Sequence, residues 1–405
     1  MFIRGLFYKI YFYKNDRLIN KIIYFIFMQE NVHRTNPLKW IILKSIFYFG
    51  IFEFGTAVTI NTFIWILKYE SRFWLLFYYT FYSTLIIYII ILISLYTSKL
   101  LFHYLYYLFF VFVAWYYHNT GGFIGLFILN NIIFELPPSL NLLIYIIFGS
   151  GLTLLCIYTD NNPKIDRIKL KCENLKGNIN IVQLTDLHLG GSYGKESVEI
   201  YVKMILEIKE KIDFVVVTGD LVDGNIRVTK DMLEPFNLIQ CPIYYITGNH
   251  EELTWKDEFI HLIENQTNLI HLPNNLVTID KRINLIGIDY KTNLDLIRGQ
   301  LKNLIYKANN NLPNIFIHHV PIFKPDTLPD FNLFLFICGH VHGGKAFPFT
   351  LIKFFFGRWL TVIIEGLYSF KDKYFVYCCS GTGTSGPVSR CFVGANIGLI
   401  TIEGN

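Results

Sequence analysis

The sequence has 405 residues, more than a single hydrophobic core usually holds, so two or more structural units are expected. Hydrophobic residues make up 53% of it and charged residues 17%, against about 25% charged in soluble domains, so part of the chain is expected in lipid. The net charge of +5 is small, and a nucleic-acid partner is not expected. The seven cysteines show no CxxC pair, which argues against a zinc ribbon or a disulfide framework.

Long apolar segments dominate the N-terminal part of the chain. They have almost no polar face, unlike a helix of a water-soluble core. Four are long enough, or nearly so, to cross a hydrocarbon layer of about 30 Å: 45–67, 73–96, 100–117 and 141–158. We therefore expect residues 1–158 to form an all-α membrane region with about four transmembrane helices in contact with membrane lipids.

Basic residues flank this region on both sides, whereas no Lys or Arg lies between Lys99 and Lys164. Four spans place both flanks on one side of the membrane, which the positive-inside rule assigns to the cytoplasm. We therefore expect an integral membrane protein whose C-terminal half lies on the cytoplasmic face. A fifth span over 121–139 would move that half outside, and this alternative stays open.

The composition changes at about Thr159, where charge, Asn and Pro over 159–178 are typical of a linker into a new domain, here 159–405. Short apolar runs then alternate with segments of helical period. The runs are 179–184, 214–217, 243–246, 284–288, 314–317 and 334–337, and the helical segments include 195–212 and 293–309. This alternation predicts an α/β domain whose strands are buried on both faces.

Polar residues that can bind metals follow five of these predicted strands. A lone His after a strand is usually a surface or core residue without a functional role. Ligands of α/β domains gather where strands end and loops begin, so the five strand ends together predict one site. The residues are Asp186, His188, Asp220, Asn249, His250, His318, His319, His340 and His342.

The residue types of this set indicate which metals it would hold. Asp186 with His188, and His340 with His342, are two residues apart and project to one side if the backbone is extended. Carboxylate, amide and imidazole donors suit Mn, Fe or Zn better than Mg or Ca. The set is too large for one ion, so we expect two divalent ions about 3.5–4 Å apart that share a carboxylate. The absence of thiolates argues against a closed structural zinc site.

The motifs "DLH", "GDLVDG", "GNHE", "HVP" and "GHVHGG" occur in this order, each after a predicted strand. Together they resemble the signature of the calcineurin-like metallophosphoesterases, over about residues 178–402. The stretch "EGLYSFKDKYFVYCCSGTGTSGPVSR" (365–390) resembles the ending of the membrane-associated branch of that family. The resemblance implies a four-layer α/β/β/α sandwich for the C-terminal domain.

The resemblance also implies a role for each residue of the site. In the family register, "HVP" places His319, two residues before Pro321, in the ligand position, and leaves His318 beside it. His250 would lie next to the metals without binding them. The first ion would be held by Asp186, His188 and His342, the second by Asn249, His319 and His340, and Asp220 would bridge the two.

The function implied is a membrane-bound, dinuclear phosphohydrolase that cleaves a phosphodiester or pyrophosphate bond with a metal-bridged hydroxide. Asp220 and His250 would be catalytic, His250 as the general acid. A lipid or nucleotide-lipid is the phosphoester substrate considered, and Lys345, a departure from the common motif, would lie near a bound phosphate. The alternative is a membrane sensor or transport module whose esterase-like domain binds metal without turnover.

The glycine-rich stretch 381–386 satisfies GxGxxG but precedes strand-like sequence instead of opening a helix, so a dinucleotide site is rejected. A loop beside the metal centre, with Arg390 meeting the substrate, and a simple turn remain as alternatives.

Overall fold

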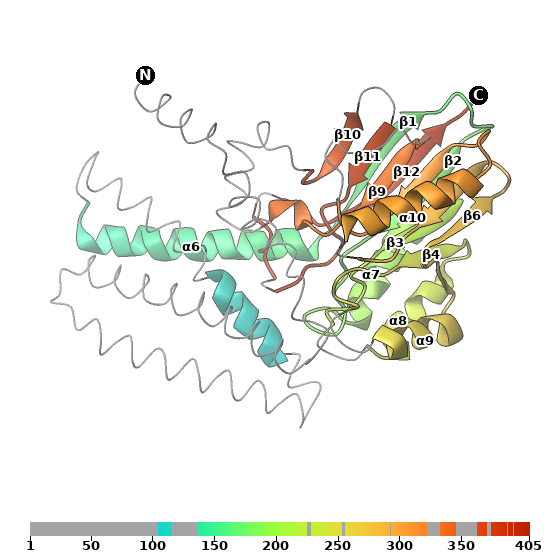
Figure 1. Cartoon of the computed structure of the whole chain (residues 1–405). Coiled ribbons are helices and arrows are strands. Elements are labelled where there is room, and N and C mark those ends of the chain that lie inside the picture. The colour runs from blue at the N-terminus through green and yellow to red at the C-terminus, as the bar shows by residue number, and fades with distance from the viewer. Residues whose placement is uncertain are drawn as a thin grey trace, which may run out of the picture.

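The computed structural model describes residues 104–115, 118 and 136–405, apart from 225–227, 253–255, 292, 322–332, 346–362, 371–373, 387 and 392. Within these residues, two six-stranded sheets face each other (Figure 1). The first has the order β1 (Lys164–Lys171), β12 (Asn396–Glu403), β2 (Ile179–Leu184), β3 (Phe214–Thr218), β4 (Ile243–Ile246), β5 (Leu269–His271). The second has the order β10 (Gly366–Phe370), β11 (Tyr374–Cys378), β9 (Leu335–Cys338), β8 (Asn314–Ile317), β7 (Ile283–Gly287), β6 (Asn275–Ile279).

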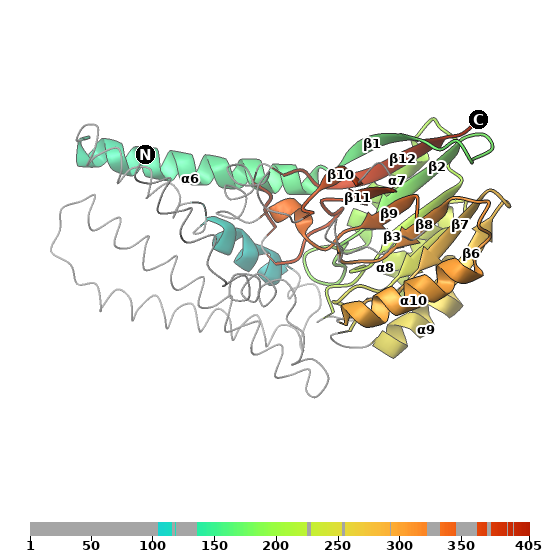
Figure 2. The ribbon, with the colours of Figure 1, turned by 45° about the horizontal axis from the view of Figure 1, so that its top comes forward.

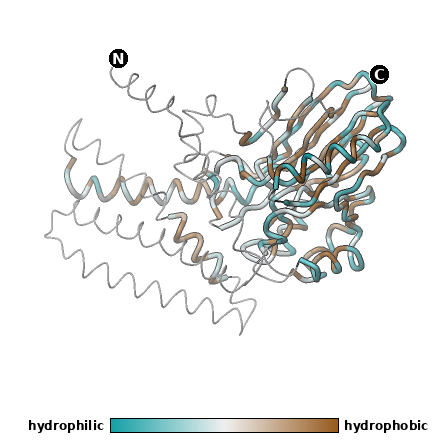
Figure 3. The backbone as a smooth tube through the Cα atoms, in the orientation of Figure 1, coloured by the Kyte–Doolittle hydropathy of each residue, from teal (hydrophilic) through white to brown (hydrophobic). Residues whose placement is uncertain are grey.

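Alternation along the central strands builds the layers, because successive side chains point to opposite faces of a sheet. Ile181 of β2 and Phe214 of β3 pack in the apolar cluster between the two sheets, together with Ile315 of the second sheet. Val182 and Val215, one residue further along, pack in the cluster under the helices of the first sheet. These strands are therefore apolar on both faces, and they are among the brown segments of Figure 3.

Helices cover the outer face of each sheet. α7 (Lys195–Leu206) buries Val198, Tyr201, Val202 and Ile205, spaced as one helical face, against the first sheet. α8 (Lys230–Leu233), η2 (Glu234–Leu238) and α9 (Lys256–Gln266) complete that layer. α10 (Leu294–Lys307) covers the second sheet, and the Asn293 side chain caps it by accepting the N–H groups of Asp295 and Leu296. The predicted α/β class is confirmed, and the layers run α/β/β/α (Figure 2).

The segment expected as a linker contains a strand. β1 lies at the edge of the first sheet and pairs in parallel with β12 near the C-terminus. In its sequence, "KIDRIKLK", the buried Ile168 and Leu170 alternate with lysines and an arginine that stay exposed, so one face is buried and the other is solvated. The charge that suggested a linker is therefore the solvent face of an edge strand.

The strand directions bring the polar loops to one place. β2, β3 and β4 run parallel to one another in the first sheet, and β7, β8 and β9 do so in the second. Their C-terminal ends therefore share one edge of the sandwich. The loops after β2, β3, β4, β8 and β9 carry the residues singled out above.

One helix of the described residues, α6 (Pro138–Asn161), is long and apolar enough to cross a membrane, by length and composition only. It contains the expected span 141–158 and projects away from the sheets (Figure 1). Of the expected span 100–117, the described part is the helix Tyr104–Trp115. The expected spans 45–67 and 73–96, and residues 121–135 of the alternative fifth span, lie outside the described residues.

The C-terminal end of α6 is fastened to the sandwich by a buried ion pair. Arg390 Nε donates to Asp160 Oδ1 at 2.7 Å, both side chains are fully buried, and Tyr193 Oη donates to Asp160 Oδ2 at 2.7 Å. Arg390 also donates to the carbonyls of Ser380 and Gly381. The expectation that Arg390 meets the substrate is therefore wrong, because its buried guanidinium forms its ion pair and hydrogen bonds with groups of the protein itself.

Candidate metal centre

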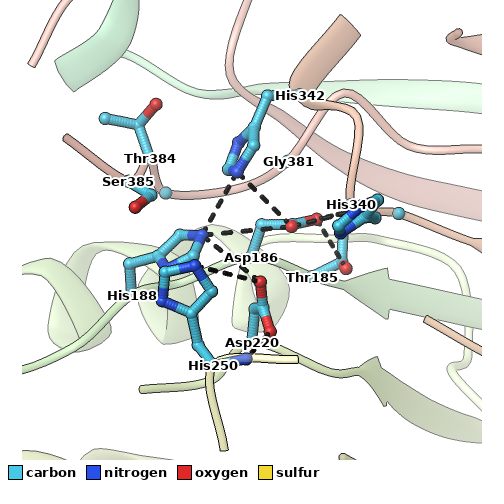
Figure 4. A network of polar contacts seen from close by, with 12 residues as sticks. Thr185, Asp186, His188, Asp220, His250, His340, His342, Gly381, Thr384 and Ser385 are labelled. Carbon is cyan, nitrogen blue, oxygen red and sulfur yellow. Dashed lines mark hydrogen bonds and ion pairs between the residues drawn. The ribbon is translucent and has the colours of Figure 1, made fainter. Parts of the chain in front are cut away.

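The structure brings eight of the nine sequence-predicted residues together at the shared strand edge, and His318 lies apart from them. Three overlapping groups of donor atoms, each within 4.8 Å of one another, make up most of the cluster. They are Asp186 with His188 and His342, His188 with Asp220 and His250, and Asp220 with His319 and His340. Figure 4 shows several of these side chains pointing toward one another.

Backbone strain is concentrated in this cluster. Asp186, His188, Asp220, His340 and His342 all have positive φ, between 47° and 74°, the left-handed region that residues with a Cβ seldom adopt. The pairs 186/188 and 340/342 therefore do not converge through an extended backbone, and that expectation was wrong. Left-handed turns directly after β2 and β9 aim these side chains instead.

Asp220 connects the two halves of the cluster. Its Oδ2 lies 3.2 Å from His319 Nε2 on one side and 3.8 Å from His188 Nε2 on the other. Its Oδ1 accepts the backbone N–H of His250 at 2.8 Å, which holds the carboxylate in place. One buried carboxylate thus faces imidazoles from both halves of the cluster.

Each half adds further donors of its own. His188 Nε2 and His342 Nε2 lie 3.2 Å apart, and His342 Nε2 lies 3.5 Å from Asp186 Oδ1. On the other side, His319 Nε2 lies 3.0 Å from Asn249 Oδ1 and 3.0 Å from His340 Nδ1. Each half of the cluster therefore combines imidazole nitrogens with oxygen donors, a set suited to a borderline first-row ion.

The neighbouring histidines of "HHVP" point in opposite directions. His319 Nδ1 lies 2.9 Å from the Thr218 carbonyl, to which it donates, so Nε2 is directed at Asp220 and Asn249. His318 Nδ1 lies 2.9 Å from the Ile288 carbonyl, and its ring stacks on Phe316. The structure thus places His319 in the cluster and His318 in the core.

Two glycines make this approach possible. A Cβ at Gly248 would lie 2.2 Å from Asp220 Oδ1, and one at Gly339 would lie 2.2 Å from Thr185 Oγ1 and 2.5 Å from Asp186 Oδ2. Any side chain at either position would displace a carboxylate of the cluster. The glycines of "TGN" and "CGH" are therefore part of the site.

Glu251 was not among the predicted site residues, yet it holds the Asp220 loop. Its buried carboxylate accepts four backbone N–H groups, those of Gly248 (2.6 Å), Leu221 (2.7 Å), Asp220 (3.0 Å) and Val222 (3.2 Å). Burial, and next the charge of Asp220, raise the pKa of the Glu251 carboxyl to about 7. The acidic residue of "GNHE" was a usable signal that sequence reasoning left aside.

Asp223 is a second residue that sequence reasoning missed. Its Oδ1 lies 3.6 Å from both His188 Nδ1 and His250 Nδ1, and its carbonyl oxygen lies 2.9 Å from His250 Nδ1. Tyr106, from the helix Tyr104–Trp115, donates to its Oδ2 at 3.4 Å. Asp223 thus orients the His250 imidazole through its carbonyl, lies beside the His188 imidazole, and joins the N-terminal region to the site.

The glycine-rich stretch 381–386 lies beside the cluster, as one of its two interpretations required. The backbone N–H of Gly383 donates to the Asp186 carbonyl at 3.1 Å, and Ser385 Oγ donates to Asp223 Oδ1 at 3.3 Å. The half-buried Lys345 Nζ donates to Thr384 Oγ1 and, at 2.7 Å, to the Ser385 carbonyl. Lys345 therefore holds this loop in place.

The electrostatics of the cluster favour a positive charge beside its carboxylates. Burial opposes protonation of His319, but Asp220 and Asp186 outweigh it and raise the pKa of this imidazole to about 9. Burial, together with Lys345 and Arg390, lowers the pKa of His342, which keeps its imidazole neutral. A proton on His319 Nε2 thus occupies a place that a metal cation would take, and the donor set fits divalent ions.

Comparison with known proteins agrees with this geometry. The model of the family "calcineurin-like phosphoesterase" matches residues 179–344, from β2 to the histidine pair after β9. The chain carries a calcineurin-like phosphoesterase domain. This family consists of phosphoester hydrolases that typically use divalent metals.

Similar metallophosphoesterases occur in bacteria and animals. The chain is 29% identical to an uncharacterised metallophosphoesterase of Campylobacter jejuni over 314 residues, which cover 74% of this chain and 79% of that one. It is 28% identical to one of Helicobacter pylori (59% and 64% covered), and 27% identical to the bovine "transmembrane protein with metallophosphoesterase domain" (60% and 57% covered). The match thus spans less than two thirds of the latter two phosphoesterase proteins.

Replacing Glu251 by Gln is expected to destabilise the phosphoesterase domain by about 1–3 kcal/mol, because an amide NH₂ group would face buried N–H donors. Thermal unfolding of the detergent-solubilised chain measures the change. Glu252→Gln is the matched control. Glu252 is one third exposed and pairs with Lys256, so this substitution should change the free energy of unfolding by less than about 0.5 kcal/mol. Equal shifts in the two variants would contradict the role assigned to Glu251.

Proposed function

We propose that the chain is a membrane-bound phosphohydrolase that uses two divalent ions to cleave a phosphodiester or pyrophosphate bond. The observation that carries this proposal is the position of Asp220, whose Oδ2 lies within 4 Å of imidazole nitrogens on both sides of the cluster, at His319 and His188. A carboxylate in this position suits a bridge between two ions.

The ligand assignment follows from the two groups of donors. Asp186, His188 and His342 would hold one ion, and Asn249, His319 and His340 the other. Asp220 would bind both. Imidazole and oxygen donors without a thiolate favour Mn, Fe or Zn.

When bound, such ions would make water nucleophilic near neutral pH and offset the charge that develops on the phosphoryl oxygens. The side chains of the centre orient the substrate and move protons. His250 donates from Nδ1 to the Asp223 carbonyl, so Nε2 faces the cluster, 3.9 Å from Asp220 Oδ2. Its side chain is 14% exposed, which lets it meet a substrate oxygen. Protonated at Nε2, His250 can give its proton to the leaving oxygen.

His319→Ala is expected to reduce the bound metal and to abolish hydrolysis of a bis-aryl phosphodiester, whereas His318→Ala should retain both. The reason is that only the His319 imidazole faces the cluster. Metal per chain is measured by mass spectrometry of the purified full chain, and turnover is measured on the same samples.

Equal metal loss in both variants would contradict the ligand assignment. Two ions without turnover in the parent protein would instead support a membrane sensor or transport module with a non-catalytic domain.

His250→Ala is expected to lower turnover about 10²- to 10⁴-fold while the metal content stays unchanged, because His250 is assigned a proton and not an ion. Using a substrate with a more acidic leaving group should restore part of the rate. If the variant loses metal along with turnover, His250 is a ligand and the general-acid role is refuted.

The substrate proposed is lipid-linked, with a lipid or nucleotide-lipid as its class. In support, Tyr106 lies on an apolar helix whose Leu108 and Phe112 are at least half exposed, and its hydroxyl donates to Asp223 at the centre. The same purified parent is assayed on the soluble phosphodiester and on a lipid-linked diphosphate in mixed micelles. A higher kcat/KM for the soluble compound would count against a lipid substrate.

The membrane assignment is the remaining part of the proposal: residues 1–158 form a membrane region of about four helices, and the domain 159–405 lies on the cytoplasmic face. α6, the basic flanks and the names of the bovine and zebrafish relatives support it. A C-terminal fusion to a fluorescent protein that folds only in the cytoplasm should be fluorescent. A C-terminal fusion to a phosphatase that folds only on the opposite side of the membrane should be inactive. The reverse pattern would indicate a fifth span.

A further inference from the structure

A second cluster of metal-binding residue types lies apart from the phosphoesterase centre. His118, Cys156 of α6 and Cys391 of the C-terminal loop offer donor atoms that all lie within 4.8 Å of one another. All three side chains are nearly fully buried, at 2–3% exposure. They are 38 and 235 positions apart in the sequence, so the fold alone brings them together.

The three donor atoms face one another directly. Cys391 Sγ lies 2.7 Å from Cys156 Sγ and 2.9 Å from His118 Nε2. Ser389 Oγ, 3.2 Å from the same nitrogen, adds an oxygen. The backbone N–H of Arg390 donates to the Cys156 carbonyl at 3.1 Å, which fixes the loop against α6.

A hydrogen-bond chain sets the tautomer of His118. Thr153 Oγ1 donates to the Gly149 carbonyl at 2.7 Å, and its single proton is thereby used. His118 Nδ1, 2.9 Å from Thr153 Oγ1, must therefore donate, which leaves the lone pair on Nε2, directed at Cys391 and Ser389. Histidines that bind metals are oriented in this way, by a hydrogen bond from the other ring nitrogen.

We propose that His118, Cys156 and Cys391 form a separate binding site for a zinc-class divalent ion, which fastens α6 and the segment at His118 to the C-terminal loop. Two thiolates and one imidazole suit Zn²⁺, and Ser389 Oγ is placed to complete four donors. Binding releases the two thiol protons and leaves both cysteines as thiolates. The sulfur atoms would move apart to about 3.8 Å, as tetrahedral geometry with Zn–S bonds of about 2.3 Å requires.

The ion would act on the phosphoesterase centre through Arg390, the residue before Cys391. The Arg390 guanidinium donates to the carbonyls of Gly381 and Gly383, and Gly383 in turn donates its N–H to the Asp186 carbonyl. The proposed ion therefore stabilises the loop that lies over the centre. It is structural, and its existence does not depend on the hydrolase proposed above.

The test uses cobalt in place of zinc in the full chain, because thiolate ligation gives Co²⁺ an intense near-ultraviolet charge-transfer band. The phosphoesterase centre has no thiolate, so its occupancy cannot produce this band. We expect the band in the parent, its loss in Cys391→Ser, and its retention in Cys241→Ser, which alters a cysteine outside the cluster. Zinc per chain should fall by about one in Cys391→Ser, while turnover shows separately whether the hydrolase centre works.

X-ray absorption of the zinc-loaded parent needs no variant to fold, and it should show zinc–sulfur scattering at about 2.3 Å. Absence of sulfur scattering and of the cobalt band in the parent would overturn the proposal. Peptide mapping that finds Cys156 and Cys391 joined by a disulfide in the freshly purified protein would also overturn it.

Discussion

The burial of two carboxylates side by side is the constraint on which the rest of the phosphoesterase domain depends. Asp186 and Asp220 are buried at the C-terminal ends of adjacent parallel strands, where water cannot screen their repulsion. Burial, and in addition the charge of Asp220, raise the pKa of the Asp186 carboxyl, so a positive charge between the two groups stabilises the ionised pair. The protonated imidazole of His319 provides one positive charge there, and divalent ions would provide more.

The residues of this cluster adopt backbone conformations that are themselves unfavourable in free energy. Five of its residues occupy the left-handed region, and each such conformation costs on the order of 1–3 kcal/mol unless the surroundings impose it. Glu251 imposes part of it by accepting four N–H groups around the Asp220 turn. The two sheets also constrain these turns, since the apolar cluster between the sheets fixes where each strand ends.

The sequence predicts the α/β class and the residues of the cluster because both depend on local patterns. Apolar runs mark β2, β3 and β4, and a polar residue after each run marks the shared edge. The pattern fails where pairing is long-range: β1 reads as a linker because its partner, β12, lies more than 200 residues away. Arg390 reads as a substrate contact for the same reason, since its partner Asp160 is 230 residues distant.

The cysteines show this limit most clearly, and they bear on how the two halves of the chain cooperate. Their spacing contains no metal motif, yet the fold places Cys391 against Cys156 and, one residue away, Arg390 against Asp160. Both contacts join the end of α6 to the loop 380–394, and that loop contacts the Asp186 turn. A movement of α6 relative to the sandwich therefore cannot leave the loop in place.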